Sequence, residues 1–299
     1  MTQPAHLAYT HNTVPTQYIQ AGPVRFAYRR FGNPSRVPLV FFQHFRGNLD
    51  NYDPAITDAL AADREVVLFD NTGVGGSSGQ ARDTVEDMAA DAALFIDALG
   101  LAQIDLLAHS MGGEVAQILT LDRPSLVRRL ILVGTGPSGG EGMAQQRPST
   151  AELFARQYDP QDLMWLPIFF SPPRQSQEAG HRWLARVRER PDRDAPVSTQ
   201  TAQAHRAAAG KWGQPTGDSH AYLKKITQPA LVVNGSDDIV IATVNSFILQ
   251  QNLPDAQLLL YPDSGHGAHF QYPESFVAQA RLFLDGSPDP GHSRLQEKP

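Results

Sequence analysis

Ser110 is the residue whose surroundings first point to chemistry. It follows an apolar run, 104–108, typical of a buried strand, and it precedes a helical pattern at 113–120. Small residues, Ala108 and Gly112, stand two positions away on either side. A strand that turns sharply into a helix needs small residues there, and the turn exposes the serine beside the free N–H groups of the helix. A serine that merely caps a helix meets the same pattern, so the rest of the chain must decide.

Two later loops hold the groups that a nucleophilic serine needs. Such a serine requires an imidazole to accept its proton and a carboxylate to fix the tautomer of that imidazole. Residues 235–238 (G-S-D-D) follow the apolar run 230–234, and residues 262–269 (P-D-S-G-H-G-A-H) follow the run 257–261. The order along the chain is therefore serine, aspartate, histidine.

Alternating strand and helix patterns predict a sheet that brings these loops to one edge. The expected strands are a hairpin of 18–20 with 24–31, then 38–43, 65–70, 104–108, 130–134, 230–234 and 257–261. The expected helices are 55–62, 84–99, the run after Ser110, 243–252 and 274–284. This alternation predicts a mainly parallel sheet covered by helices on both faces, with functional loops at the carboxyl ends of the strands.

The pattern changes between residues 137 and 223, where no strand-like run occurs. Helical patterns at 179–188 and 199–212 are the clearest in this stretch. Prolines are expected to break its helices, at Pro167, Pro172, Pro173, Pro191 and Pro196. We therefore predict that 137–223 is a helical cap inserted between two strands of the sheet.

The predicted domain organisation follows from this insertion. Residues 1–136 and 224–285 are expected to form the core, with the cap 137–223 between them. Residues 286–299 are polar and rich in Pro and Gly, so we expect a disordered tail.

Four motifs together resemble those of the α/β-hydrolase superfamily, over roughly residues 16–285. They are 108–112 (A-H-S-M-G), 70–77 (D-N-T-G-V-G-G-S), 235–238 (G-S-D-D), and 265–266 (G-H) with 272–274 (Y-P-E). The resemblance implies an α/β fold with a mostly parallel eight-stranded sheet flanked by helices and a helical cap after the sixth strand. It also implies that Ser110 is the nucleophile, with a histidine as base and an aspartate that orients it.

Two of these assignments involve a choice between neighbours. The family's G-x-x-D spacing from Gly235 favours Asp238 over Asp237 as the acid. The family's G-H pair favours His266 over His269 as the base. The predicted catalytic residues are therefore Ser110, Asp238 and His266.

The resemblance also implies an oxyanion hole formed by two backbone N–H groups. Met111, directly after the serine, would supply one of them. Relatives read H-G-x-x-G after the third strand, whereas this chain has 43–47 (Q-H-F-R-G). Aligning Gly47 with the last glycine of the motif makes Phe45 the second donor, whereas an alignment that starts at His44 makes it Arg46. We favour Phe45.

Several residues are candidates for contact with a substrate. His44 stands where relatives carry a glycine. His109 is beside the serine, where an elbow geometry points it away from a substrate, so we expect it to pack or to form a local hydrogen bond. Trp165 and Phe169, together with Met164, Phe170 and Trp183, are expected either to line an apolar pocket under the cap or to pack the cap on the core. His269 is expected to line the pocket or to be structural. The candidate substrate-binding set is His44, His109, Trp165, Phe169 and His269.

Composition excludes several other function classes. The chain has 299 residues, a net charge of −6 and no cysteine, which argues against a nucleic-acid partner and excludes disulfides, thiolate catalysis and cysteine metal sites. No metal-ligand spacing such as H-E-x-x-H occurs, and no lysine follows the glycine-rich turn at 70–77 as a phosphate loop requires. We expect no metal, no cofactor and no membrane partner, and the oligomeric state stays open. No apolar stretch is long enough for a bilayer, and residues 1–15 lack a signal-peptide pattern, so the expected location is the cytoplasm.

The predicted function is hydrolysis of a small carboxylic ester or lactone through an acyl-enzyme. A serine at the elbow argues against haloalkane dehalogenation and epoxide opening, whose enzymes in this superfamily use aspartate. Hydrolysis of a carbon–carbon bond and cofactor-free perhydrolysis use the same three residues and stay as alternatives. A non-catalytic protein that binds a small ligand is the other alternative, although no residue of the triad is missing.

Overall fold

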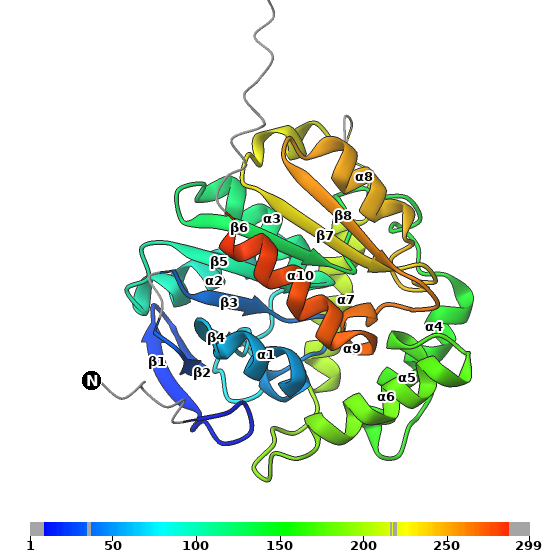
Figure 1. Cartoon of the computed structure of the whole chain (residues 1–299), viewed down its shortest axis with the longest axis horizontal. Helices are drawn as coiled ribbons and strands as arrows, with labels where there is room; N and C mark the ends of the chain where they lie inside the picture. The colour runs from blue at the N-terminus through cyan, green and yellow to red at the C-terminus, as the bar shows by residue number, and fades with distance from the viewer. Residues whose placement is uncertain (1–8, 35–36, 216, 218–219, 287–299) are drawn as a thin grey trace, which may run out of the picture.

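The computed structural model describes residues 9–34, 37–215, 217 and 220–286 (Figure 1). Its centre is one sheet of eight strands, in the order β1-β2-β4-β3-β5-β6-β7-β8. The strands are β1 (Gln17–Ala21), β2 (Val24–Gly32), β3 (Leu39–Phe42), β4 (Glu65–Phe69), β5 (Ile104–His109), β6 (Val127–Val133), β7 (Ala230–Gly235) and β8 (Ala256–Tyr261).

The first two strands run antiparallel to their neighbours, and the other six run parallel. β1 and β2 form the predicted hairpin, with Ile19 opposite Phe26, and β2 pairs antiparallel with β4. From β4 to β8 every pairing is parallel. β5 lies in the middle, and all six of its residues are buried, as expected for a parallel strand covered on both faces. The carboxyl ends of β3, β5, β6, β7 and β8 therefore meet at one edge, and the predicted fold class is confirmed.

Helices cover both faces of this sheet (Figure 1). Apolar side chains on one face pack against α1 and α10, and those on the other face pack against α2, α3 and α8. The core helices are η1 (Leu49–Asn51), α1 (Pro54–Ala61), α2 (Val85–Ala98), α3 (Met111–Asp122), α8 (Val244–Asn252), α9 (Ala268–Gln271) and α10 (Pro273–Asp285).

The described residues between 137 and 223 form helices, turns and loops, with no strand among them. Their helices are α4 (Pro148–Ala155), η2 (Gln161–Met164), α5 (Trp165–Phe169), α6 (Arg174–Val187), α7 (Thr199–Trp212) and η3 (Ala221–Lys225). One detail of the prediction is wrong: Pro167 lies inside α5 rather than breaking a helix. It occupies the first turn, where a missing N–H group removes no hydrogen bond.

One strand boundary also differs from the sequence prediction. β6 begins at Val127, three residues before the expected start at Leu130. The extra residues include Arg128, whose guanidinium forms an ion pair with Asp105 on the adjacent β5. Charged side chains at the beginning of a strand hide it from an argument that looks for apolar runs.

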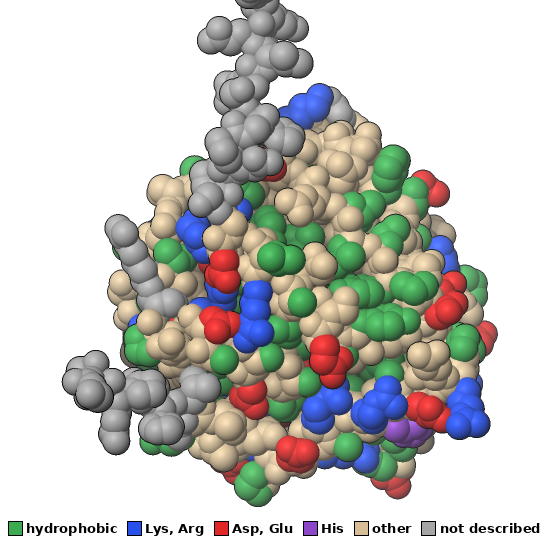
Figure 2. Space-filling view, viewed as in Figure 1, with side chains coloured by type: hydrophobic (Ala, Val, Ile, Leu, Met, Phe, Trp, Pro, Cys, Tyr) green, Lys and Arg blue, Asp and Glu red, His purple; other side chains and the backbone are tan. Residues whose placement is uncertain are grey.

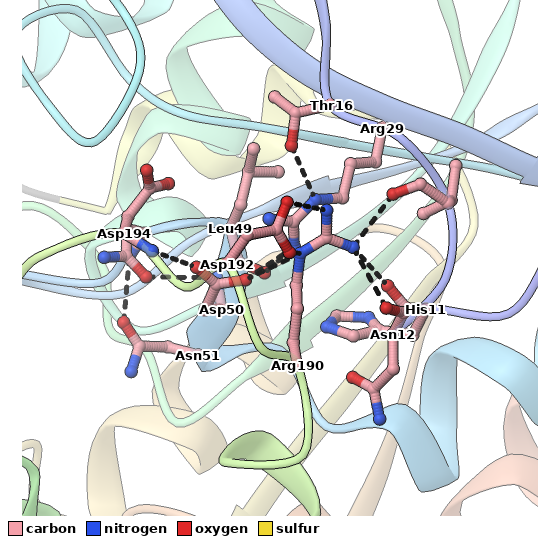
Figure 3. Close-up of polar contacts among 12 residues, drawn as sticks. His11, Asn12, Thr16, Arg29, Leu49, Asp50, Asn51, Arg190, Asp192 and Asp194 are labelled. Atoms are coloured by element: carbon pink, nitrogen blue, oxygen red, sulfur yellow. Dashed lines mark hydrogen bonds and ion pairs between the residues drawn. The ribbon is translucent and has the colours of Figure 1, made fainter.

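A buried polar network attaches residues 137–223 to the core (Figure 3). Arg190, after α6, donates hydrogen bonds from Nη1 to the carbonyl oxygens of His11 and Val14 at 3.3 and 2.8 Å. The backbone N–H of Asp194 donates to Asp50 Oδ2 at 2.7 Å. The other oxygen of Asp50 pairs with Arg29 of β2 at 2.7 Å, with both side chains 1% exposed. The loop between α6 and α7 is thus held at a fixed place on the core.

The described face in Figure 2 shows no patch of a single charge. On the described part of the face in Figure 2, Lys and Arg side chains lie interspersed with Asp and Glu. No helix within the described ranges is both long and apolar enough to cross a membrane. The predicted disordered tail, 286–299, lies outside the described residues except for Gly286.

Candidate active site

Ser110 occupies a sharp turn between β5 and α3. Its backbone has φ 56° and ψ −122°, a left-handed conformation that is strained for a residue with a side chain. Gly112 lies so close to the end of β3 that an added methyl group would overlap the carbonyl oxygen of Phe42. The small residue that the sequence argument required at 112 is therefore needed for this close approach, and the turn has the strained geometry expected of a nucleophile elbow.

Ser110, His266 and Asp238 form a continuous hydrogen-bonded chain. His266 Nε2 lies 2.8 Å from Ser110 Oγ, and His266 Nδ1 lies 2.8 Å from Asp238 Oδ2. All three side chains are buried. A carboxylate at Asp238 accepts a hydrogen bond from Nδ1–H, which keeps the proton on Nδ1 and leaves Nε2 as the acceptor for the serine hydroxyl.

The loop after β7 fixes the aspartate of this chain. Asp238 Oδ1 accepts hydrogen bonds from the backbone N–H groups of Val240 and Ile241 at 2.8 and 3.0 Å. The alternative acid, Asp237, is exposed and accepts a hydrogen bond from the hydroxyl of Ser236. The structure therefore brings Asp238, and not its neighbour, to the histidine.

The loop after β3 lies beside Ser110 and is supported by a glutamine. Gln43 Oε1 accepts from the backbone N–H of His44 at 2.9 Å, and Gln43 Nε2 donates to the carbonyl of Asn48 at 2.9 Å. Gly47 packs on this side chain so closely that a methyl group there would overlap it. Gln43 thus fixes the loop from beneath, and the loop leaves room for a side chain at His44.

Two backbone N–H groups near Ser110 are free of protein partners. In the parts of the chain that the structure describes, no hydrogen bond uses the amide of Phe45 or that of Met111, and both residues line the cavity at Ser110. The amide of Arg46 instead donates to His205 Nδ1 at 3.2 Å, and the backbone of Arg46 is left-handed, with φ 61°. Of the two candidates for the second oxyanion donor, Phe45 is the one whose N–H group is unoccupied.

His44 is buried as a neutral imidazole. Its Nδ1 lies 2.9 Å from the carbonyl oxygen of Phe45, and because a carbonyl can only accept, Nδ1 carries the proton. Burial lowers the pKa of His44 to about 3, despite the opposing effect of this hydrogen bond. The ring packs edge-on against Trp165 and Phe169, with centroid distances of 4.7 and 5.1 Å. A histidine can therefore stand where relatives carry glycine, because the aromatic side chains of α5 enclose it.

The structure places the other two histidines of the candidate binding set behind the cavity wall. Neither His109 nor His269 lines the cavity that contains Ser110. His109 Nε2 lies 3.0 Å from the carbonyl oxygen of His266, and the rings of His109 and His269 are 4.6 Å apart. Burial is the largest of the causes that lower the pKa of each imidazole well below its usual value. Both rings therefore support the segment that carries His266.

A cavity of about 290 Å³ opens above Ser110 and His266. Trp165 and Phe169 line it as expected, whereas Met164 faces a separate cavity, and Phe170 and Trp183 are buried in the packed core. Sequence reasoning missed most of its other apolar lining residues, namely Met143, Phe154, Ile168, Val240 and Ile241. Residues from the core and from 137–223 share this wall, so no local pattern marks them.

One charged residue of the wall, Glu114, was also missed by the sequence argument. It follows Ser110 by four positions on α3, so the two share one helix face, which is the signal that could have revealed it. The side chain is 2% exposed, and its Oε2 atom has no hydrogen-bond partner among the described residues. Burial raises the pKa of Glu114 from its usual 4.5 to about 8.

The comparisons with known proteins agree with the fold. A family model described as alpha/beta hydrolase fold matches residues 37–273. The chain belongs to the α/β-hydrolase family. A poly(3-hydroxyalkanoate) depolymerase of Ectopseudomonas oleovorans is 31% identical over 252 residues, which cover 79% of this chain and 80% of the relative.

Two further members of the family are similar over most of their length. A pimeloyl-[acyl-carrier protein] methyl ester esterase of Nitrosomonas europaea is 30% identical, over 75% of this chain and 86% of the relative. The solved structure of an alpha/beta hydrolase fold protein from Chitinophaga pinensis is 42% identical, with a TM-score of 0.87, and covers 93% of this chain and all of that one. As a member of this family, the chain is assigned to the hydrolases.

The described residues form no metal site beside these features. Among the residues that the structure describes, no group of three or more His, Cys, Asp or Glu side chains is arranged to hold a metal ion.

Proposed function

We propose that the protein is a serine hydrolase that cleaves a small carboxylic ester or lactone through an acyl-enzyme. The observation that carries the proposal is the hydrogen-bonded chain from Ser110 through His266 to Asp238, at the bottom of a largely apolar cavity. Two relatives named for ester chemistry, the depolymerase and the methyl ester esterase, support it.

Acylation begins with proton transfer from Ser110 to His266. The serine oxygen attacks the carbonyl carbon while His266 Nε2 takes its proton, and Asp238 stabilises the imidazolium that forms. The negative oxygen of the tetrahedral intermediate accepts hydrogen bonds from the free N–H groups of Phe45 and Met111. His266 then returns the proton to the departing alcohol oxygen, which leaves an ester on Ser110.

Deacylation repeats these steps with water. His266 takes a proton from the water molecule, which attacks the acyl carbon and releases the carboxylic acid and the free serine. The neutral, buried rings of His109 and His269 pack behind His266, so the base keeps its position through both half-reactions.

We further propose that residues 137–223 act as a cap that selects the substrate. Trp165 and Phe169 of α5 form part of the cavity wall, and the N–H of Gly267 donates to the carbonyl of Phe169 at 2.9 Å. The cap is thereby joined to the loop that carries His266. Substrate contacts are expected from Trp165, Phe169 and His44.

A fluorophosphonate probe tests the nucleophile directly. The wild-type protein should gain one label, at Ser110, and Ser110→Ala should gain none while it keeps the same circular dichroism spectrum and melting temperature. p-Nitrophenyl acetate and butyrate should be hydrolysed by the wild type and not by Ser110→Ala. A folded wild-type protein that stays unlabelled, or that cleaves a ring-cleavage dienoate but neither ester, would contradict the proposal.

A further inference from the structure

The cavity wall contains one buried carboxyl group that the proposed chemistry does not use. The other polar side chains of the wall have at least one hydrogen bond or are exposed. Ser110 and His266 are bonded to each other, and His44 is bonded through Nδ1, although its Nε2 has no partner among the described residues; Gln146 and Arg206 are exposed. Glu114 is neither, because it is 2% exposed and no hydrogen bond or ion pair joins its carboxyl to another described residue.

This carboxyl does not serve the fold. Burial without a partner is unfavourable for a carboxyl group, whether it is charged or neutral. Apolar side chains, including Met111 and Met143, line the same cavity, so leucine or methionine would fit the position better in purely structural terms. A hydrogen-bonding group of a bound substrate would give the carboxyl its missing partner, and so would give it a function in the cavity wall.

The carboxyl is protonated at neutral pH. Burial raises the pKa of Glu114 to about 8, and no other cause contributes. A neutral carboxylic acid can donate one hydrogen bond and accept others, which suits a hydroxyl or keto oxygen. A substrate with an ammonium group is disfavoured, because it would meet an uncharged acid at Glu114 and the positive guanidinium of Arg206 in the same wall.

The position of Glu114 on α3 places that oxygen near the reacting ester group. Glu114 lies in the first turn of α3, which begins directly after Ser110, and side chains of an α-helix tilt toward its N-terminus. Both residues line the same cavity, so a substrate held at Ser110 can bring an oxygen a few carbons from its scissile bond to the carboxyl.

We propose that Glu114 is a substrate-binding residue, and that the substrate is an ester or lactone with a neutral hydroxyl or keto oxygen a few carbons from the scissile bond. This inference rests on the proposed serine hydrolase function. Glu114 selects among esters, and Ser110 with His266 cleaves them.

The inference is tested with pairs of esters in which one member carries a hydroxyl group and the other a methyl group at the same position. Methyl 3-hydroxybutyrate against methyl 3-methylbutyrate examines the acyl side, and 2-hydroxypropyl acetate against isobutyl acetate examines the alcohol side. The wild type should favour the hydroxyl member of one pair by about tenfold in kcat/KM, the effect of one hydrogen bond in a closed site. Glu114→Gln, which keeps a donor and an acceptor, should retain most of this preference, and Glu114→Leu should abolish it.

Met143→Leu is the matched control, because Met143 lines the same cavity without a hydrogen-bonding group. It should change the rates of both members of a pair alike. Labelling of Ser110 by the fluorophosphonate should persist in Glu114→Leu, which shows that the variant is folded and reactive. A wild type without preference in either pair, or an unchanged preference in Glu114→Leu, overturns the inference, and so does a preference for an ester with an ammonium group.

Failure of the proposed function would look different. In that case the wild type cleaves none of the four esters and takes up no label.

Discussion

Replacing Glu114 by glutamine should stabilise the protein at neutral pH. The carboxyl has a usual pKa of 4.5 in an unfolded chain, and burial raises this pKa to about 8 in the folded protein. Between these values folding must bind a proton, so the carboxyl disfavours the folded state. Its penalty is absent below pH 4.5, grows as the pH rises and levels off above pH 8.

The size of the effect follows from this shift. Each pH unit above 4.5 costs about 1.36 kcal/mol until the folded pKa is reached. The penalty is therefore between about 1 and 2 kcal/mol at pH 5.5 and about 3 kcal/mol at pH 7. Glu114 lies in the first turn of α3, but a helix dipole offers typically about 0.3–1 kcal/mol, which is less than the penalty at neutral pH. Glutamine has nearly the same shape and no charge at any pH, so Glu114→Gln should recover most of the difference.

Urea unfolding followed by circular dichroism at pH 5.5 and pH 7 measures this. The gain in the free energy of unfolding of Glu114→Gln over the wild type should roughly double between the two pH values. Glu152→Gln is the matched control, because Glu152 is exposed on α4, and it should leave the dependence on pH unchanged. The titratable groups that share the cavity wall with Glu114 are His44, His266 and Arg206, and Tyr222 lies nearby. An equal gain at both pH values, or no gain, would refute the reasoning. Either result would mean that the carboxyl of Glu114 is already ionised in the folded protein at pH 5.5.

Three further predictions concern other parts of the molecule. Asp238→Asn should lower kcat for ester hydrolysis by roughly 10⁴-fold with the fold intact. An amide in place of the carboxylate does not keep the proton on Nδ1 of His266. A loss below tenfold would remove Asp238 from the mechanism. Asp50→Ala should lower the free energy of unfolding in urea by about 3–5 kcal/mol, because it leaves the buried guanidinium of Arg29 without its carboxylate. A loss below about 1 kcal/mol would show that the network of Figure 3 does not hold residues 137–223 on the core. Acid should destabilise the protein through its buried imidazoles, whose pKa burial lowers from 6.5 to about 3, 3 and 4 in His11, His44 and His205. These three groups stabilise the folded state above pH 6.5, and together they should lose about 4 kcal/mol by pH 5.5. His109 and His269, whose pKa burial also lowers, add to this loss. The measurement uses Glu114→Gln so that the carboxyl does not offset the imidazoles, and equal stability at pH 7 and pH 5.5 would contradict the prediction.

Most of the fold could be predicted because its strands and helices have local signals. The apolar run before Ser110 and the helical pattern at 199–212 match β5 and α7 closely. Burial on both faces leaves a continuous apolar run in the sequence, and burial on one face of a helix leaves a helical period. The start of β6 could not be predicted, because Arg128 is held there by Asp105 of another strand. Pairing between strands is not visible in the sequence of one of them.

The residues of the candidate site also fall into those with a local sequence signal and those that depend on distant segments. Ser110, Asp238 and His266 stand on loops that follow strands, and the motifs around them are short and local. The choice between Phe45 and Arg46 required the structure, because it depends on which backbone N–H group His205, far away in the sequence, already occupies. The protonation of His44 likewise depends on the aromatic rings that α5 places around it.

The sequence by itself determined the family, the order of strands and helices, and the three residues expected to carry the chemistry. It could do so because a sharp turn and a buried strand restrict the residue types close to them along the chain. The short motifs around Asp238 and His266 add the resemblance to the family. Only the tertiary structure decided which side chains share the cavity, with His109 and His269 behind its wall and Glu114 in it. The cavity forms where α3, the loop after β7 and residues 137–223 meet, and contacts between such distant segments leave no period in the sequence.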